Sequence, residues 1–92
     1  MPRPKIRRKI RGTPLASYFK PAGIPLRILK ESEISLAEFE AIRLVDLENN
    51  PQEETSKKMQ ISQPTLSRIL KSARGKIAEA IVKGQAIKIK KR

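Results

Sequence analysis

The chain has 92 residues, the length of one small domain, and a net charge of +12 that favours a polyanionic partner such as DNA, RNA or an anionic membrane surface. It contains no cysteine and no histidine, which excludes disulfides and the usual ligands of a structural zinc site, so we expect no metal and no cofactor. It lacks a long apolar run and an N-terminal signal peptide, so we expect a cytoplasmic protein without a membrane partner.

The charge falls into three blocks. Residues 1–30 hold nine basic and no acidic residues, residues 31–54 hold eight acidic and one basic, and residues 55–92 hold eleven basic and one acidic. Segregation of this kind predicts a basic working surface and an acidic back.

Residues 1–14 form the first segment and carry six basic residues and three prolines. They offer too little apolar surface to order themselves, so we expect a mobile basic arm. Such arms lie along phosphates or enter a minor groove, although a solvated tail is the plain alternative. The candidate phosphate contacts of this arm are Arg3, Lys5, Arg7, Arg8, Lys9 and Arg11.

Residues 15–34 mix apolar pairs with turn residues. Tyr18 and Phe19 are expected to anchor the segment to the core, with base stacking as a weaker alternative. The Pro-Ala-Gly sequence at 21–23 predicts a turn, and residues 26–29 could form a short strand after it.

A first helix is predicted from residue 36 to about 49. Ser35 and Glu38 have the spacing of a capping box, in which each side chain bonds the other residue's backbone amide. The acidic residues of this helix are expected to line its outside, where they would face away from DNA or toward a protein partner. They are Glu38, Glu40, Asp46 and Glu48.

A second helix is predicted at about 52–59, with Asn50 as its cap and Pro51 at its first position. A tight turn over 60–62 follows, so 52–70 has the outline of a helix-turn-helix. Ser56 is small enough for the close helix approach that this motif needs. Gln60 stands where glycine is usual because a positive φ is favoured there.

The third helix is predicted over about 63–83, with Gly84 as its stop. On a helical wheel the apolar residues, from Leu66 to Ile81, lie on one side, and basic and polar residues of the N-terminal half lie opposite. Gly75 lies in the middle of this helix without an evident reason. The candidate base contacts are Gln63, Pro64, Ser67 and Arg68, and the further phosphate contacts are Thr65, Lys71, Arg74 and Lys57.

Residues 85–90 alternate between apolar and basic side chains, which predicts a half-buried strand. This strand could pair with residues 26–29 or with a second copy of the chain. A homodimer is therefore a candidate assembly.

Several separated stretches resemble one known family. They are YFKPAGIPL, SLAEFEAIRLVDLE and the run from QEE through IS, RIL, SAR and KIAEAIV to the last strand. The chain resembles a domain-of-unknown-function family of small prokaryotic proteins, predicted to bind DNA through a helix-turn-helix similar to region four of sigma factors. Relatives often have cysteines near residues 7–11, and Ala and Gly where this chain has Ser56 and Gln60. The resemblance implies sequence-specific binding to duplex DNA and transcriptional regulation. For such a protein in the cytoplasm we expect association with the nucleoid.

We therefore expect a mainly α fold: a three-helix helix-turn-helix domain over residues 15–92, with a basic N-terminal arm and short β-strands flanking the helices. The expected function is sequence-specific binding of double-stranded DNA. The alternatives are an RNA-binding or ribosome-associated protein, and an adaptor that docks a protein through its acidic first helix. An enzyme is not expected, because the chain lacks a candidate nucleophile-base pair and a glycine-rich phosphate loop.

Overall fold

A computed structural model describes residues 9–91. Its elements, in chain order, are β1 (Tyr18–Phe19), the 3-10 helix η1 (Leu26–Ile28), β2 (Glu31–Ile34), α1 (Leu36–Ala41), the π-helix η2 (Ile42–Leu47), α2 (Gln52–Met59), α3 (Gln63–Lys83) and β3 (Ala86–Ile89). The predicted mainly α fold with short flanking strands is confirmed. The bounds predicted for the second and third helices match those of α2 and α3.

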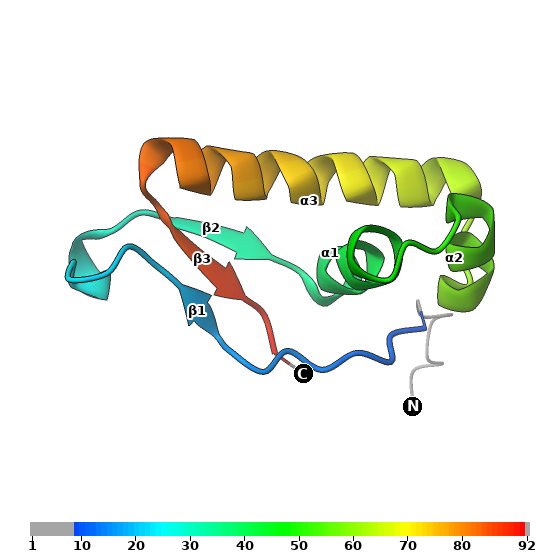
Figure 1. Ribbon diagram of the computed structural model, residues 1–92, viewed down its shortest axis with the longest axis horizontal. Coiled ribbons are helices and arrows are strands. Elements are labelled where there is room, and N and C mark those ends of the chain that lie inside the picture. The colour runs from blue at the N-terminus through cyan, green and yellow to red at the C-terminus, as the bar shows by residue number, and fades with distance from the viewer. Residues whose placement is uncertain (1–8, 92) are drawn as a thin grey trace, which may run out of the picture.

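The long helix α3 runs along the length of the molecule, and the other elements lie beside it (Figure 1). The three-stranded sheet lies against its C-terminal half, and α1, η2 and α2 gather at its N-terminal half. The domain therefore has two parts joined by one helix: a helical part that contains the helix-turn-helix, and a sheet part.

The sheet has the strand order β1-β3-β2. The last strand, β3, lies in the centre, where it pairs antiparallel with β1 and parallel with β2. In the parallel pair Ser32 lies beside Ile87 and Ile34 beside Ile89. Residues separated by 55 positions thus meet, and the sheet fixes the C-terminal end of α3 to the segment before α1.

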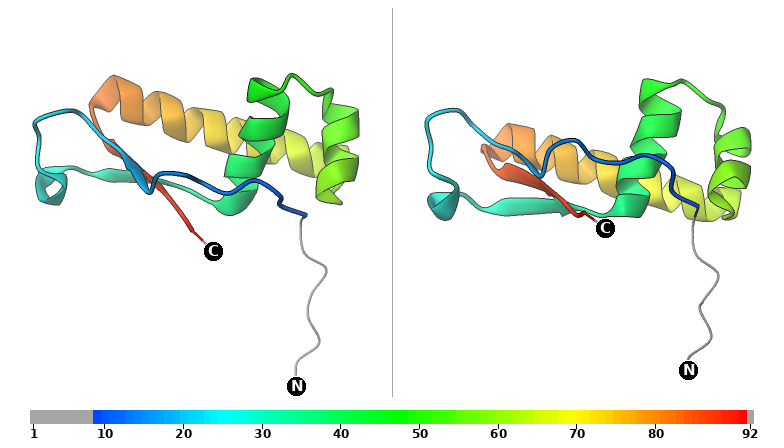
Figure 2. Two further views of the ribbon diagram at one scale, coloured as in Figure 1. Left: turned by 60° about the horizontal axis from the view of Figure 1, so that its bottom comes forward. Right: turned by 90° about the horizontal axis from the view of Figure 1, so that it is seen from below.

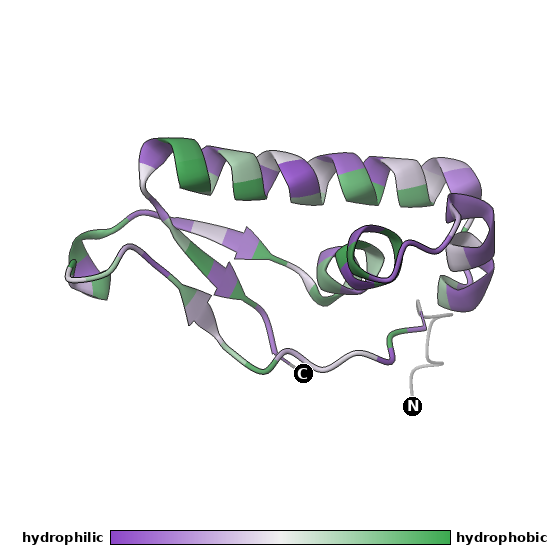
Figure 3. Cartoon of the chain, viewed as in Figure 1, coloured by the Kyte–Doolittle hydropathy of each residue, from purple (hydrophilic) through white to green (hydrophobic). Residues whose placement is uncertain are grey.

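The sealed core lies in the helical part. Ala41, Leu44, Met59, Leu66 and Leu70 are all buried and form one cluster between α1, η2, α2 and α3. Figure 3 shows apolar residues recurring along α1 and α3 and mostly hydrophilic residues over α2. The two helices of the helix-turn-helix are thus packed together by this apolar cluster, which contains no residue of the sheet.

The first helix begins as predicted. The Ser35 hydroxyl accepts from the Glu38 amide at 3.1 Å, and the Glu38 carboxylate accepts from the Ser35 amide at 2.8 Å, which completes the capping box. The helix is not uniform, however, because its second half, η2, widens into a π-helix and ends at Leu47. Asn49 then takes a positive φ of 60° and turns the chain toward α2.

Two local expectations are corrected. Residues 26–28 form a 3-10 turn behind Pro25, and the strand that pairs with β3 is β2 instead. Asn50 does not cap α2, because the helix begins one residue later and Pro51, which has no side-chain oxygen, occupies the cap position. The start of α3 at Gln63 is as predicted, with Ser62 as its N-cap.

Two apolar residues are also less buried than expected. Ile81, predicted on the buried side of the third helix, is 72% exposed and lines an open hollow beside Phe19 and Ile87 of the sheet. Phe19 is 56% exposed, so it does not anchor its segment in the core.

Candidate nucleic-acid interface

The turn between α2 and α3 has the geometry that a helix-turn-helix requires. Gln60 adopts the left-handed conformation, with φ 59° and ψ 46°, and the Ile61 amide bonds back to the Ser56 carbonyl at 3.0 Å. Ser56 is 4% exposed, and its hydroxyl donates a hydrogen bond to the Glu53 carbonyl at 2.8 Å. A larger side chain at this position would separate the two helices. Gln60 therefore adopts the backbone conformation that the motif favours, although it is not the usual glycine.

The start of α3 is fixed by a small polar network. The Ser62 hydroxyl accepts from the Thr65 amide at 3.2 Å and donates to the Thr65 hydroxyl at 2.8 Å. The guanidinium of Arg68 approaches the same Thr65 hydroxyl at 3.4 Å. Thr65, predicted to contact phosphate, is therefore occupied in holding the helix cap and in orienting Arg68.

The four predicted base-contact residues lie together. Gln63, Pro64, Ser67 and Arg68 are all exposed on the first two turns of α3, and Lys71 continues the same side one turn later. Lys57, a predicted phosphate contact, is exposed on the last turn of α2. Within residues 9–91, neither Arg68 nor Lys71 forms an ion pair. The structure thus gathers a polar and basic surface at the N-terminal end of α3, and we call it the α3 face.

Arg74, another predicted phosphate contact, is engaged inside the protein. Its guanidinium bonds both carboxylate oxygens of Asp46 in η2, at 2.7 and 3.2 Å. The hydrogen bonds that Arg74 donates to Asp46 raise the pKa of Arg74. This side chain is therefore turned toward η2 rather than free for a phosphate.

The segment before β1 is held on the domain. The Lys9 amide donates to the Met59 carbonyl at 2.9 Å, and the amides of Arg11 and Gly12 each donate to the Glu40 carboxylate at 3.0 Å. Residues 9–14, which we call the strap, cross α1 on their way from α2 to the sheet (Figure 2). The expectation of a free arm is therefore wrong for the strap. Arg3, Lys5, Arg7 and Arg8 lie outside the described residues.

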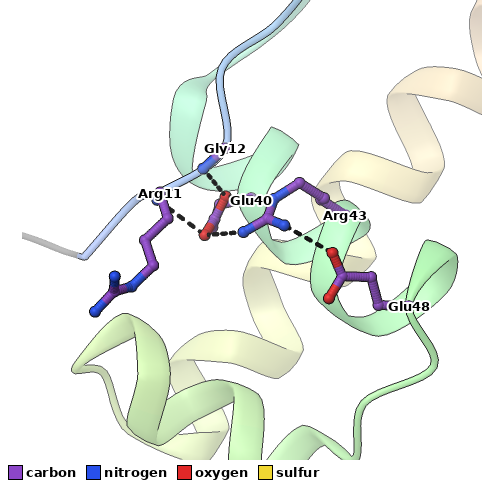
Figure 4. Close-up of polar contacts among 5 residues, drawn as sticks. All are labelled: Arg11, Gly12, Glu40, Arg43 and Glu48. Carbon is purple, nitrogen blue, oxygen red and sulfur yellow. Dashed lines mark hydrogen bonds and ion pairs between the residues drawn. The ribbon is translucent and has the colours of Figure 1, made fainter.

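Glu40 is the residue that anchors the strap. Its carboxylate is 1% exposed and also accepts from Arg43 at 3.0 and 2.8 Å, while Arg43 reaches Glu48 at 2.8 Å (Figure 4). Burial acts to raise the pKa of Glu40, but the hydrogen bonds from Arg43 and from the two strap amides outweigh it and lower that pKa below 4.5. A Cβ at Gly12 would lie 2.7 Å from Arg43 Cδ and 2.9 Å from Glu40 Oε1, so a larger residue here would displace the Arg43 and Glu40 side chains.

The strap places basic residues beside the helix-turn-helix. The Lys9 amide bonds Met59, the last residue of α2, so the strap begins next to the turn over 60–62. The side chains of Lys9 and Arg11 are exposed there. The strap therefore brings basic residues next to the end of α2, on the other side of α1 from α3, and the basic residues of positions 1–8 precede them in the chain.

The acidic residues of the first helix were expected to line its outside, and two of them do not. Glu38 and Glu40 are buried, and Glu38 accepts from Ser72 at 2.6 Å and from Lys76 at 2.9 Å on α3. Asp46 and Glu48 are each paired with an arginine. Glu38 and Glu40 therefore do not line the outside of the helix, whereas Asp46 and Glu48 are exposed as expected but are paired within the same chain. The capping-box spacing pointed to one contact of Glu38, whereas nothing in the sequence near Glu40 indicated that it would hold the strap.

The architecture defines a helix-turn-helix domain extended by a small sheet. The chain matches the family described as "Protein of unknown function DUF134" over residues 1–91, and it belongs to that family. No solved structure matches the chain. None of the helices within residues 9–91 is both long and apolar enough to cross a membrane.

Curated relatives carry the name UPF0251 protein. One from Caldanaerobacter subterraneus is 52% identical over 89 residues, which covers 97% of this chain and 75% of the relative. One from Halothermothrix orenii is 50% identical and covers 96% of this chain and 65% of its own length. One from Moorella thermoacetica is 49% identical over 89 residues, which covers 97% of this chain and 60% of the relative. This chain therefore spans between three fifths and three quarters of these relatives.

Proposed function

We propose that this protein binds double-stranded DNA in a sequence-specific manner and regulates transcription, with α3 as the helix that enters the major groove. The observation that carries the proposal is the α3 face: Gln63, Ser67 and Arg68 project from the first turns of a helix held by a well-formed turn. This is the part of a helix-turn-helix that reaches base edges.

The chemistry of the α3 face suits the major groove. The Arg68 guanidinium has the fork of donors that pairs with guanine O6 and N7, and the Gln63 amide can bond adenine N6 and N7. Arg68 is exposed, and the only hydrogen bond of its guanidinium to the described residues is the long contact to the Thr65 hydroxyl. Exchanging that contact for a base would therefore sacrifice little of the folded protein's stability.

The phosphate contacts would come from both sides of this helix. Lys57 at the end of α2, Lys71 on α3 and the strap residues Lys9 and Arg11 are all exposed, and Lys9 bonds the last residue of α2. If about five phosphates are engaged, the logarithm of the binding constant should fall with the logarithm of salt concentration at a slope of about −4 to −5.

The experiment begins with selection of bound sequences from a random duplex pool. Affinity for the selected duplex and for a scrambled duplex is then measured with the wild type and with Arg68→Ala. We expect Arg68→Ala to lose about 10- to 100-fold in discrimination between the two. The control is Arg27→Ala, which removes the same charge from an exposed residue of η1 at the opposite end of the molecule (Figure 1).

Two results would contradict the proposal. One is equal loss on selected and scrambled duplexes for Arg68→Ala, since a phosphate contact or a general charge effect would explain that. The other is tighter binding to a structured RNA than to any selected duplex, unaffected by Arg68→Ala, since that would favour the RNA-binding alternative. The adaptor alternative is weakened because the acids of α1 and η2 bind groups of the same chain.

A further inference from the structure

The sheet part of the domain has an open apolar groove. Its volume is about 620 Å³, and it lies between the sheet, α1, η2 and the strap. The aliphatic side chains of its floor come from β3, η2 and α3 and are only partly buried. They are Ile42, Ile77, Ile87 and Ile89.

Large apolar side chains also stand around the rim of this groove. Leu15 is 99% exposed, Leu47 is 73% exposed and Phe19 is 56% exposed. Figure 3 shows the apolar segment before β1 on the opposite side of the molecule from α3. A single exposed leucine is ordinary, but three large apolar residues around one apolar hollow form a contiguous patch of the kind that marks an interface.

The location explains why the chain does not close this groove itself. The buried core cluster belongs to the helical part, and within residues 9–91 α3 is the helix that packs most extensively on the sheet. The edge strand β1 has two residues and pairs only with β3. A sheet with so short an edge and an uncovered apolar face gains stability when another apolar surface covers it.

We infer that a second copy of this chain covers the groove, with the same groove on both copies facing across a two-fold axis. A two-fold interface must be self-complementary, and this patch contains both projecting side chains and a hollow to receive them. The inference does not depend on DNA binding.

Charge supports a second copy at this surface. Two chains of charge +12 repel each other over most of their surfaces. Among the residues that line the groove, Arg43 is the only charged one, and it is paired with Glu40 and Glu48, each at 2.8 Å. Two copies can therefore meet here without bringing unpaired like charges together.

The apolar surface also extends beyond the groove. A smaller hollow adjoins the groove, shares Phe19 and Ile87 with it and extends to Ile81. Its one charged lining residue, Lys20, folds its ammonium back onto the Ile24 carbonyl at 2.7 Å. A partner that covers both hollows would therefore bury more apolar surface than the groove alone offers.

The test is sedimentation velocity of the full chain without DNA, at high salt and over a wide range of protein concentration. We expect the wild type to pass from monomer to dimer as concentration rises. Leu15→Glu should weaken the dimer at least about tenfold, because it places a charge in an apolar interface. Leu15 is almost fully exposed in one copy, so this variant is expected to fold, which circular dichroism would verify.

The matched control is Val82→Glu. Val82 is 82% exposed, lines neither hollow and undergoes the same change of charge, so this variant should dimerise like the wild type. A wild type that stays monomeric at every concentration would overturn the inference and would leave the groove to a different partner. Equal effects of Leu15→Glu and Val82→Glu would overturn it as well.

Discussion

The hydroxyl of Ser72 donates a 2.6 Å hydrogen bond to the buried carboxylate of Glu38, and this contact joins the start of α1 to the middle of α3. The same carboxylate accepts from the Ser35 amide at 2.8 Å and from Lys76 Nζ at 2.9 Å. One side chain therefore caps α1 and fixes the position of the helix proposed to read DNA. Because these donors are matched to an anion, the contact depends on the charge of Glu38.

Replacement of Glu38 by Gln should lower the free energy of unfolding by about 2 kcal/mol, because charge-assisted hydrogen bonds are lost and an amide hydrogen is turned toward donors. Urea denaturation followed by circular dichroism would measure the change. Glu33→Gln is the control, since Glu33 is exposed on β2 and should have little effect. Equal losses in the two variants would contradict the role assigned to Glu38.

Stability should also depend on pH through Glu38 and Glu40. Burial acts to raise the pKa of Glu38, but hydrogen bonds from Ser72, Ser35 and Lys76 lower it below its ordinary value of 4.5, as similar contacts do for Glu40. A carboxyl group with a lowered pKa in the folded state stabilises the protein above the pKa of the unfolded chain. This contribution should be lost as pH falls below 4.5 and through the lower pKa values of the folded state. Denaturation at a series of pH values should show a shallower acid slope in Glu38→Gln than in Glu33→Gln.

Replacement of Gln60 by Gly should stabilise the protein by about 0.5–1 kcal/mol. A residue with a Cβ is strained in the left-handed conformation by about 1–2 kcal/mol, and the greater freedom of glycine in the unfolded chain cancels only part of this gain. Thermal denaturation would show it as a rise in melting temperature. Lys71→Gly, in the exposed interior of α3, should have the opposite effect. A fall in melting temperature for Gln60→Gly would show that the Gln60 side chain itself stabilises the turn.

Gly12→Val should release the strap, because the added side chain would occupy the space of Arg43 Cδ and Glu40 Oε1. Hydrogen exchange followed by NMR should then show faster exchange of the Lys9 and Arg11 amides, which donate to Met59 and Glu40. Gly75→Ala is the control, since a Cβ at Gly75 meets nothing within 4 Å, and it should leave these amides unchanged. Unchanged exchange in Gly12→Val would mean that the strap tolerates a side chain at this position.

Asp46→Asn should strengthen binding to duplex DNA severalfold, on the proposed function, because it frees Arg74 for a phosphate. The salt dependence should steepen by about one unit of slope. Arg74→Ala in the same background separates this effect from a simple change of net charge, since the added slope should disappear in the double variant. A gain in affinity that survives Arg74→Ala would show that Arg74 does not contact phosphate.

The sequence by itself determined the helices and the turn between α2 and α3. The capping box of Ser35 and Glu38 and the stop at Gly84 are signals read within four residues, and the structure has both of them. Local hydrogen bonds and backbone preferences suffice for such features because their partners are neighbours in the chain.

The tertiary structure alone decided which strands pair and which charges are buried. The central position of β3, its parallel pairing with β2 and the contacts of Glu40 with the strap join residues that lie 28 or more positions apart. A glutamate within an acidic stretch has the same local signal whether it faces water or a buried arginine. Only the arrangement of α1 between the strap and α3 determined that Glu38 and Glu40 would hold the domain together instead of facing a partner.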